Sequence, residues 1–169
     1  MERELKPGDK GQGQQHPIIS VIYKFETGES ERIRTALSIG SERGVRMGKS
    51  VEREVLRVVD DYMKGSYRAD EVLLRSVFHK EAVMSGFFGA ECVVADPSPF
   101  IDDIVSAPSM ESTKVDYRPT VDHVFVKGDI AAVIATEHGF RGEMKIVDCF
   151  HLIRIDGIWS IISKLFTSC

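Results

Sequence analysis

Residues 148–166 read DCFHLIRIDGIWSIISKLF and predict a β-hairpin. Two apolar runs, 143–155 and 158–166, flank the dipeptide Asp156-Gly157. Asp-Gly strongly favours the two-residue turn that joins neighbouring antiparallel strands. We therefore expect these two runs to pair with each other at the end of the domain.

Polar residues interrupt the hairpin at Asp148, His151 and Lys164. Alternate side chains of a strand share one face, so Asp148 is expected on the face of Phe150 and Leu152, which are typical core residues. Burial beside apolar neighbours raises the pKa of a carboxyl group and suits it to act as a general acid or base. The alternative is a structural ion pair between Asp148 and Lys164, which would explain both residues without chemistry.

Helices are predicted upstream of the strands. Apolar residues recur at helical spacing between Ser50, the expected N-cap, and Gly65, the expected left-handed end. A second, shorter helix follows Asp70, and a third covers 98–107 and ends before Pro108.

Strands dominate the rest of the chain, and their predicted ranges are 82–88, 117–126, 130–138, 143–155 and 158–166. Short turns containing glycine join the later ones, so these strands are expected to be antiparallel neighbours. Helices followed by a run of antiparallel strands indicate an α+β domain, with three helices on one face of a curved sheet. The predicted domain covers residues 50–169.

Residues 1–49 are predicted to be a leader that is weakly ordered or partly extended. Its GDKGQGQQHP stretch is polar and rich in Gly and Gln, whereas residues 17–25 are rich in β-favouring side chains. We expect residues 17–25 to be the part of the leader able to pair with a strand.

Composition excludes several classes of protein. The chain has 169 residues, of which 43% are hydrophobic and 28% charged, as in a single globular domain with a tail. A net charge of −4 without a dense Lys/Arg run argues against nucleic acid, and no apolar run approaches the length of a membrane span. Three cysteines without a CxxC pair argue against a disulfide framework or a zinc site. The predicted location is the cytoplasm.

Three stretches resemble one known family: YMKGSYRAD (62–70), VFHKEAVMSG (77–86) and the hairpin DCFHLIRIDGIWSIISKLF (148–166). They are similar to the Tyr-x-x-Gly turn after the first helix, the Phe-His-x-x-Ala start of the first strand and the closing hairpin of nuclear-transport-factor-2-like proteins. Within this superfamily the chain looks closest to the SnoaL-like and "putative lumazine-binding" proteins. The resemblance spans roughly residues 50–166.

The resemblance implies a cone-shaped domain in which a strongly bent sheet wraps the helices around an apolar pocket. It also implies a homodimer formed through the outer face of the sheet. Members of the superfamily include metal-free dehydratases, isomerases and cyclases as well as non-catalytic binding modules. We therefore expect a small apolar ligand and no metal or cofactor, with either acid/base lyase or isomerase chemistry or, alternatively, ligand binding or dimerisation without catalysis.

Three residues are the candidate catalytic groups. Asp148 is expected to act as acid or base, His79 as its partner, and Tyr62 as a hydrogen-bond donor to a developing oxyanion. Two alternatives remain open. His79 could donate a hydrogen bond to a carbonyl at a helix end, and Tyr62 could pack in the core with one hydrogen bond to its hydroxyl. The candidate ligand-binding residues combine aromatic and basic side chains, and they are Phe88, His123, Phe150, Trp159 and Lys164.

Overall fold

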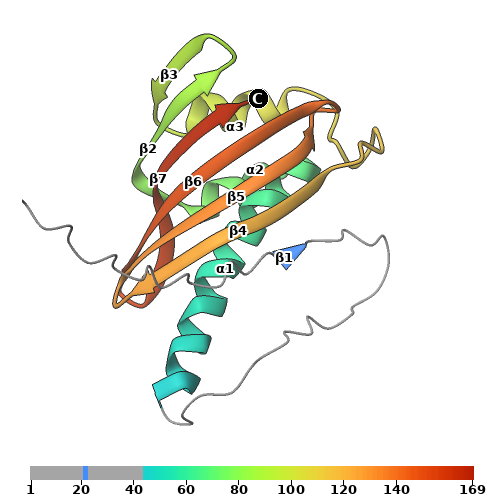
Figure 1. Ribbon diagram of the computed structural model, residues 1–169. Coiled ribbons are helices and arrows are strands. Elements are labelled where there is room, and N and C mark those ends of the chain that lie inside the picture. The colour runs from blue at the N-terminus through green and yellow to red at the C-terminus, as the bar shows by residue number, and fades with distance from the viewer. Residues whose placement is uncertain (1–20, 23–43) are drawn as a thin grey trace, which may run out of the picture.

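The computed structural model describes residues 21–22 and 44–169, and its helices precede most of its strands (Figure 1). In chain order the elements are β1 (Val21–Ile22), α1 (Gly44–Arg68), α2 (Glu71–Val77), β2 (Phe78–Phe88), β3 (Glu91–Ala95), α3 (Ser98–Val105), β4 (Arg118–Lys127), β5 (Ile130–Phe140), β6 (Met144–Ile155) and β7 (Ile158–Ser168). The predicted α+β class is confirmed. Strand β3 is an additional element that the sequence pattern did not predict.

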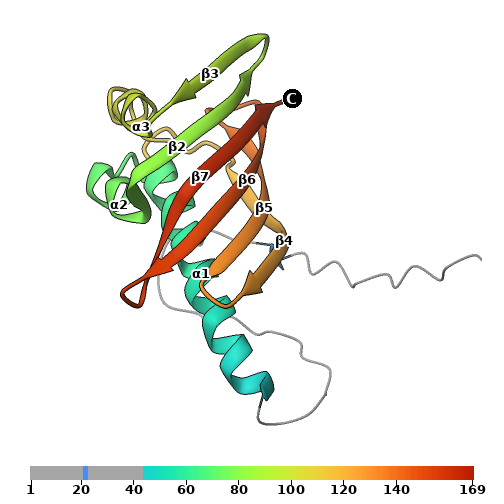
Figure 2. The same ribbon diagram turned by 90° about the vertical axis from the view of Figure 1, so that its left-hand side faces the viewer.

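The strands form a single sheet with the order β1-β4-β5-β6-β7-β2-β3. All neighbours are antiparallel except β2 and β7, which run parallel. Helices α1, α2 and α3 lie on one side of the strands, and the sheet bends around α1 (Figure 2). Among the residues that the structure describes, no helix combines the length and the apolar character needed to cross a membrane.

The predicted β6–β7 hairpin is confirmed, and its turn has the expected backbone. Asp156 and Gly157 have φ angles of 52° and 81°, which are the left-handed values of a two-residue hairpin turn. The register is not uniform, however. Leu152 pairs with Ile161 whereas the preceding His151 pairs with Ser163, so Ile162 is an extra residue on β7.

The bulge at Ile162 reverses the alternation of side chains along β7. Trp159 and Ile161 face the helices, and strict alternation would next turn residue 163 inward. The extra residue instead places Lys164 opposite Phe150 and Phe166 opposite Asp148, on the concave face of the sheet. The bulge therefore decides that Lys164 is buried.

Both predicted boundaries of the first helix differ from the structure, and α3 ends at Val105, before the predicted residue 107. Helix α1 begins at Gly44, so Ser50 lies inside the helix and does not cap it. The helix also continues past Gly65 to Arg68, and Ala69 takes the left-handed conformation with φ 54°. Gly65 has a different role: a Cβ there would lie 2.8 Å from Leu74 Cγ, so its missing side chain lets α2 pack closely against α1.

Part of the predicted leader is described. Val21 and Ile22 form the short edge strand β1, paired with Val121 and Thr120 of β4. Gly44 to Lys49 belong to α1. The remaining leader residues, 1–20 and 23–43, lie outside the described residues.

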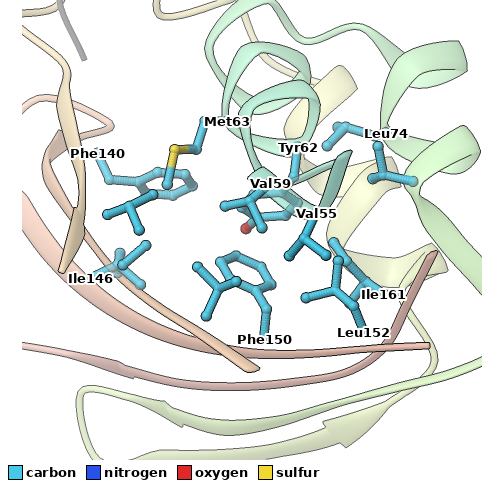
Figure 3. Close-up of a cluster of buried hydrophobic side chains, with 14 of the residues drawn as sticks. Val55, Val59, Tyr62, Met63, Leu74, Phe140, Ile146, Phe150, Leu152 and Ile161 are labelled. Atoms are coloured by element: carbon cyan, nitrogen blue, oxygen red, sulfur yellow. The ribbon is translucent and has the colours of Figure 1, made fainter. Parts of the chain in front are cut away.

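The core lies between α1 and the concave face of the sheet (Figure 3). Tyr62 is fully buried at its centre, with its ring centroid 4.9 Å from that of Phe150 and 5.9 Å from those of Phe78 and Phe100. The other labelled side chains in Figure 3 are apolar: Val55, Val59, Met63, Leu74, Phe140, Ile146, Leu152 and Ile161. The interior around Tyr62 is thus filled by aromatic and aliphatic groups.

Candidate functional site

Three charged residues are buried side by side on the concave face of the sheet. Glu137 of β5, Asp148 of β6 and Lys164 of β7 are 0%, 0% and 3% exposed. Cross-strand register places them as diagonal neighbours, because Asp148 pairs with Ala135 and with Phe166. Charged side chains are seldom buried to this extent without partners, so each buried charge is expected to have a group that compensates it.

Asp148 forms an ion pair with Lys164. Lys164 Nζ lies 2.9 Å from Asp148 Oδ1. The same ammonium group lies 4.9–5.9 Å from four ring centroids, which belong to Tyr62, Phe100, Phe150 and Phe166. These contacts stabilise the positive charge of Lys164 inside the protein through cation–π attraction. The structural alternative considered for Asp148 and Lys164 is therefore present in the fold.

Glu137 is the third member of the cluster. The Tyr117 hydroxyl donates a hydrogen bond to Glu137 Oε2. Burial, the negative charge of Asp148 and hydrogen bonding with that carboxylate raise the pKa of Glu137 well above its usual value, while Lys164 and Tyr117 act in the opposite direction. The environment thus favours a protonated Glu137 beside an ion-paired Asp148.

Tyr62 and Ser66 connect this cluster with helix α1. Burial raises the pKa of the Tyr62 hydroxyl, the charges of Asp148 and Glu137 raise it further, and hydrogen bonding with Ser66 lowers it. The two hydroxyls interact, but among the described residues neither has a partner at normal hydrogen-bond geometry. The same holds for Glu137 Oε1 and for both carboxylate oxygens of Asp148, whose contact with Lys164 is an ion pair. Six polar side chains, Tyr117 included, thus form one buried group in which several oxygen atoms make no hydrogen bond of normal geometry.

A cavity of about 240 Å³ adjoins the buried group at Ser66. Its walls come from the end of α1, the end of α3, the loop before β4 and the β5–β6 turn. Most lining residues are apolar, namely Ala69, Ile104, Ala107, Pro108, Met110 and Val115. The polar lining residues are Ser66, Ser109, Thr113 and Arg141.

The hydroxyls that line this cavity differ in their bonding. Ser109 Oγ accepts the backbone N–H of Ser112, and Thr113 Oγ1 donates to the carbonyl of Ser109, so both serve the loop itself. Ser66 is only 2% exposed and its hydroxyl lacks such a bond. Ser66 is therefore the lining residue whose hydroxyl does not serve the loop.

The predicted catalytic residues are only partly brought together. Tyr62 and Asp148 belong to the same buried group, as their electrostatic interaction shows. His79 lies elsewhere: its Nδ1 accepts the backbone N–H of Glu81 at 3.1 Å. Because the preceding Phe78 points inward onto Tyr62, strand alternation directs His79 to the other face of β2. Lys164, not His79, is the charged partner of Asp148.

The predicted ligand-binding residues are dispersed, and none lines the cavity beside Ser66. Phe150 and Lys164 belong to the filled core, and Trp159 is buried with the Arg154 guanidinium 5.4 Å from its ring. Phe88 is 43% exposed at the end of β2, and His123 is exposed on the outer face of the sheet. Aromatic character alone did not distinguish core residues from lining residues.

Sequence reasoning missed Glu137, Tyr117 and Ser66. A signal for Glu137 existed, because it continues the alternation of Ala131, Val133 and Ala135 toward the core. Ser66 lies one turn after Tyr62 and shares its helix face. Tyr117 had a similar signal, because it begins the predicted strand 117–126 and alternates with Val121 toward the core, although the observed β4 begins only at Arg118.

Chemically, the buried group can hold and relay a proton without a metal. Protonated Glu137 can donate, Asp148 can accept, and Tyr62 supplies a neutral hydroxyl between them and Ser66. Within the described part of the chain, no three His, Cys, Asp or Glu side chains are grouped as metal ligands.

Comparison with solved structures identifies the fold. An NTF2-like protein of unknown function from Shewanella baltica superposes with a TM-score of 0.64 at 18% identity, covering 72% of this chain and 95% of the other. A second, from Silicibacter pomeroyi, gives a TM-score of 0.63 at 22% identity over 73% and 98% of the two chains. A ketosteroid isomerase-like protein from Erwinia carotovora gives 0.51 at 15% identity over 69% and 95%. At these identities the likeness concerns the fold alone.

Family comparison extends this result from the fold to the sequence. No curated protein matches the chain significantly. The family model described as "Putative lumazine-binding" matches residues 50–167, which is well over half of the chain. This is the region that contains the helices, the curved sheet and the buried polar group. The chain therefore belongs to the "Putative lumazine-binding" family, and its fold is similar to that of NTF2-like proteins.

Proposed function

We propose that the domain binds a small, largely apolar molecule in the cavity beside Ser66. The observation that carries this proposal is the largely apolar cavity, whose lining includes Ser66, a residue with a buried hydroxyl that has no partner of normal hydrogen-bond geometry among the described residues. A buried hydroxyl without a partner is unfavourable, and an oxygen or nitrogen atom of a ligand would satisfy it.

The size of the cavity limits the ligand. Its volume of about 240 Å³ lies below the roughly 300–1,000 Å³ of sites that enclose drug-sized molecules. A dinucleotide or a large polycyclic compound would not fit. The apolar walls and the single deep hydroxyl favour a compact metabolite with few polar atoms.

Filling the cavity tests this proposal. Ala107 is an exposed lining residue, so Ala107→Trp can place an indole in the cavity without disturbing the core. Ligand-observed NMR with a library of small apolar metabolites should detect binding to the wild type and its loss in Ala107→Trp. Ala90→Trp, at the exposed β2–β3 turn, is the matched control and should bind normally. Equal binding by all three proteins would contradict the proposed site.

Metal-free acid/base catalysis is a second candidate function, favoured by the carboxyl pair behind Ser66. Neither Asp148 nor Tyr62 lines the cavity. In this proposal a proton from the substrate therefore reaches Asp148 through the hydroxyls of Ser66 and Tyr62, and Glu137 takes the partner role expected of His79. The reaction would be a dehydration or an isomerisation. Glu137→Gln should then abolish turnover while ligand affinity is retained, whereas a purely structural cluster would show no turnover in either protein.

We also propose a homodimer formed through the outer face of the sheet. Ile134, Cys149 and Leu165 are aligned across β5, β6 and β7 on this face, and Ser85 and Val94 continue the row onto β2 and β3. Ile134, Leu165 and Val94 are 38%, 52% and 71% exposed. A row of mostly apolar side chains on the outer face suits a two-fold contact with a second copy.

Sedimentation equilibrium tests the dimer. Leu165→Lys should convert a dimer into a monomer, because a charge would be buried at the centre of the contact. Val72→Lys, at a residue that is 80% exposed on α2, is the matched control and should leave the dimer intact. A wild-type monomer at micromolar concentration would refute the proposal.

The cytoplasm remains the proposed location. Cys92, Cys149 and Cys169 are free thiols. A reducing compartment suits a protein with free thiols, two of which are exposed.

A further inference from the structure

We infer that the ligand of the cavity beside Ser66 is a small carboxylic acid whose carboxylate is bound by Arg141, and that Asp103 competes with it for this arginine. The inference rests on the proposed small-molecule function and adds the chemical class of the ligand.

Arg141 is the one charged residue among the described residues that line the cavity. It lies in the β5–β6 turn with φ 50°, and its backbone N–H donates to Met110 Sδ at 3.2 Å. The N–H of Gly142 donates to the carbonyl of Gly139 at 2.9 Å and closes the turn. Arg141 is thus anchored at both the turn and the loop before β4, so its side chain begins from a defined position at the cavity.

The guanidinium group of Arg141 is only partly used by the protein. Its Nη2 donates to Asp103 Oδ2 at 2.7 Å and to the Asp103 carbonyl at 3.1 Å. A guanidinium carries five N–H donors in a planar fork that matches a carboxylate. Both bonds to Asp103 leave from Nη2, so the Nε and Nη1 donors remain for a second anion.

Asp103 holds Arg141 weakly. Its side chain is 62% exposed and that of Arg141 is 34% exposed, so water screens their attraction. None of the lining residues is acidic. A carboxylate that enters the cavity therefore meets one positive group and no negative lining group, and it can share or displace the Asp103 interaction.

The other lining residues indicate the chemical character of the ligand apart from its carboxylate. Ile104, Met110 and Val115 provide apolar wall, and Ser66 provides the buried hydroxyl. An acid with a compact apolar body satisfies Arg141 with its carboxylate, and a further oxygen atom on that body would satisfy Ser66. A neutral hydrocarbon would leave both polar groups unused, and a cation would be repelled by Arg141.

The experiment compares carboxylic acids with their amides, which have nearly the same shape and no charge. Phenylacetate and hexanoate are titrated against phenylacetamide and hexanamide, using the full chain and NMR line broadening or chemical shifts. The wild type should bind each acid at least roughly tenfold more tightly than its amide, the ratio expected for a hydrogen bond to a charged group. Arg141→Gln should remove this preference and leave the affinity for the amides unchanged.

Two matched controls separate a local effect from general charge. Arg154→Gln removes an arginine that is 29% exposed and paired with Asp129 at the opposite end of β6, and it should keep the preference for acids. Asp103→Asn should tighten acid binding about threefold, because the competitor is removed. Asp102→Asn changes the same charge on the same helix, at a residue paired with Arg75, and should not tighten binding.

Each outcome decides between the two proposals. Equal affinity for acids and amides, or an acid preference that survives in Arg141→Gln, overturns the carboxylate inference and leaves small-molecule binding intact. Absence of binding by all four probes at millimolar concentration overturns the carboxylate inference together with the proposed function. An equal gain in Asp103→Asn and Asp102→Asn overturns the competitor role of Asp103.

Discussion

The middle of the sheet and the cavity beside Ser66 both have buried polar groups, but the surroundings of these groups differ. Around Asp148 the protein supplies its own partners, since Lys164 neutralises the carboxylate and four aromatic rings surround the ammonium group. Beside the cavity, the Ser66 hydroxyl has neither a counter-ion nor a partner of normal hydrogen-bond geometry among the described residues. Burial of a polar residue is therefore a weaker sign of a ligand site than burial without a partner.

The largest expected effect is on the ion pair at the middle of the sheet. Asp148→Asn would leave Lys164 charged and buried without its counter-ion, so we expect the free energy of unfolding to fall by about 3–5 kcal/mol. Urea denaturation measures this difference. A fall below about 1 kcal/mol would instead assign Asp148 a chemical role and remove the contrast with Ser66.

A double substitution provides the control for this prediction. In Asp148→Asn combined with Lys164→Met, both charges are absent and the methionine can pack among the rings. Replacing a buried ion pair by apolar groups is often neutral or stabilising, so most of the lost stability should return. If the double variant is as unstable as Asp148→Asn, the fall in the free energy of unfolding does not arise from Lys164 being buried without its counter-ion.

A smaller, pH-dependent effect is expected from Glu137. Its pKa is raised in the folded protein, chiefly by burial, so folding favours the protonated form. The stability that this proton contributes is complete below the pKa of the unfolded chain and is lost as pH rises through the folded pKa. Glu137→Gln keeps a donor toward Asp148 and an acceptor for Tyr117, so the variant should gain melting temperature relative to the wild type as pH rises.

Thermal unfolding from about pH 5 to about pH 9 measures this difference. Glu143→Gln, at an exposed position in the β5–β6 turn, is the matched control and should follow the wild type. A difference between Glu137→Gln and the wild type that does not change with pH would show that Glu137 is not protonated preferentially in the folded state.

The smallest effect on stability is expected at Ser66, beside the cavity. Ser66→Ala removes a hydroxyl without a protein partner at normal geometry, so the free energy of unfolding should change by less than about 1 kcal/mol. Affinity for a bound small molecule should fall in the same variant. Urea denaturation measures the change in stability, and NMR titration measures the affinity for the small molecule. A large loss of stability would show that the Ser66 hydroxyl stabilises the fold.

The general fold was predictable because it follows from local patterns. The Asp156-Gly157 turn, the helical spacing after Val51 and the glycine turns between later strands each depend on a few consecutive residues. Strand β3 was missed because Glu91–Ala95 is a short edge strand whose pairing with β2 supplies much of its definition. Gly65 was misread as a helix end because its actual role, contact with Leu74 of the next helix, is not local.

The buried group was harder to predict than the elements that hold it. The placement of Asp148 beside Phe150 on the core face followed from strand alternation. Glu137 and Tyr117 join Asp148 only because β5 pairs with β6 and the loop before β4 folds over the same face. His79 follows the inward-facing Phe78 in the sequence, but it lies on the other face of β2 and does not reach Asp148.

The sequence by itself determined the order of helices and strands, the closing hairpin and the inward direction of Asp148, because each depends on spacing along a single segment. Only the tertiary structure decided which side chain neutralises Asp148 and where a molecule can enter. Lys164 faces inward because the extra residue Ile162 shifts the register between two strands, and the cavity beside Ser66 exists because four separate segments meet without filling the space. Both are properties of packing between segments, which spacing within one segment does not specify.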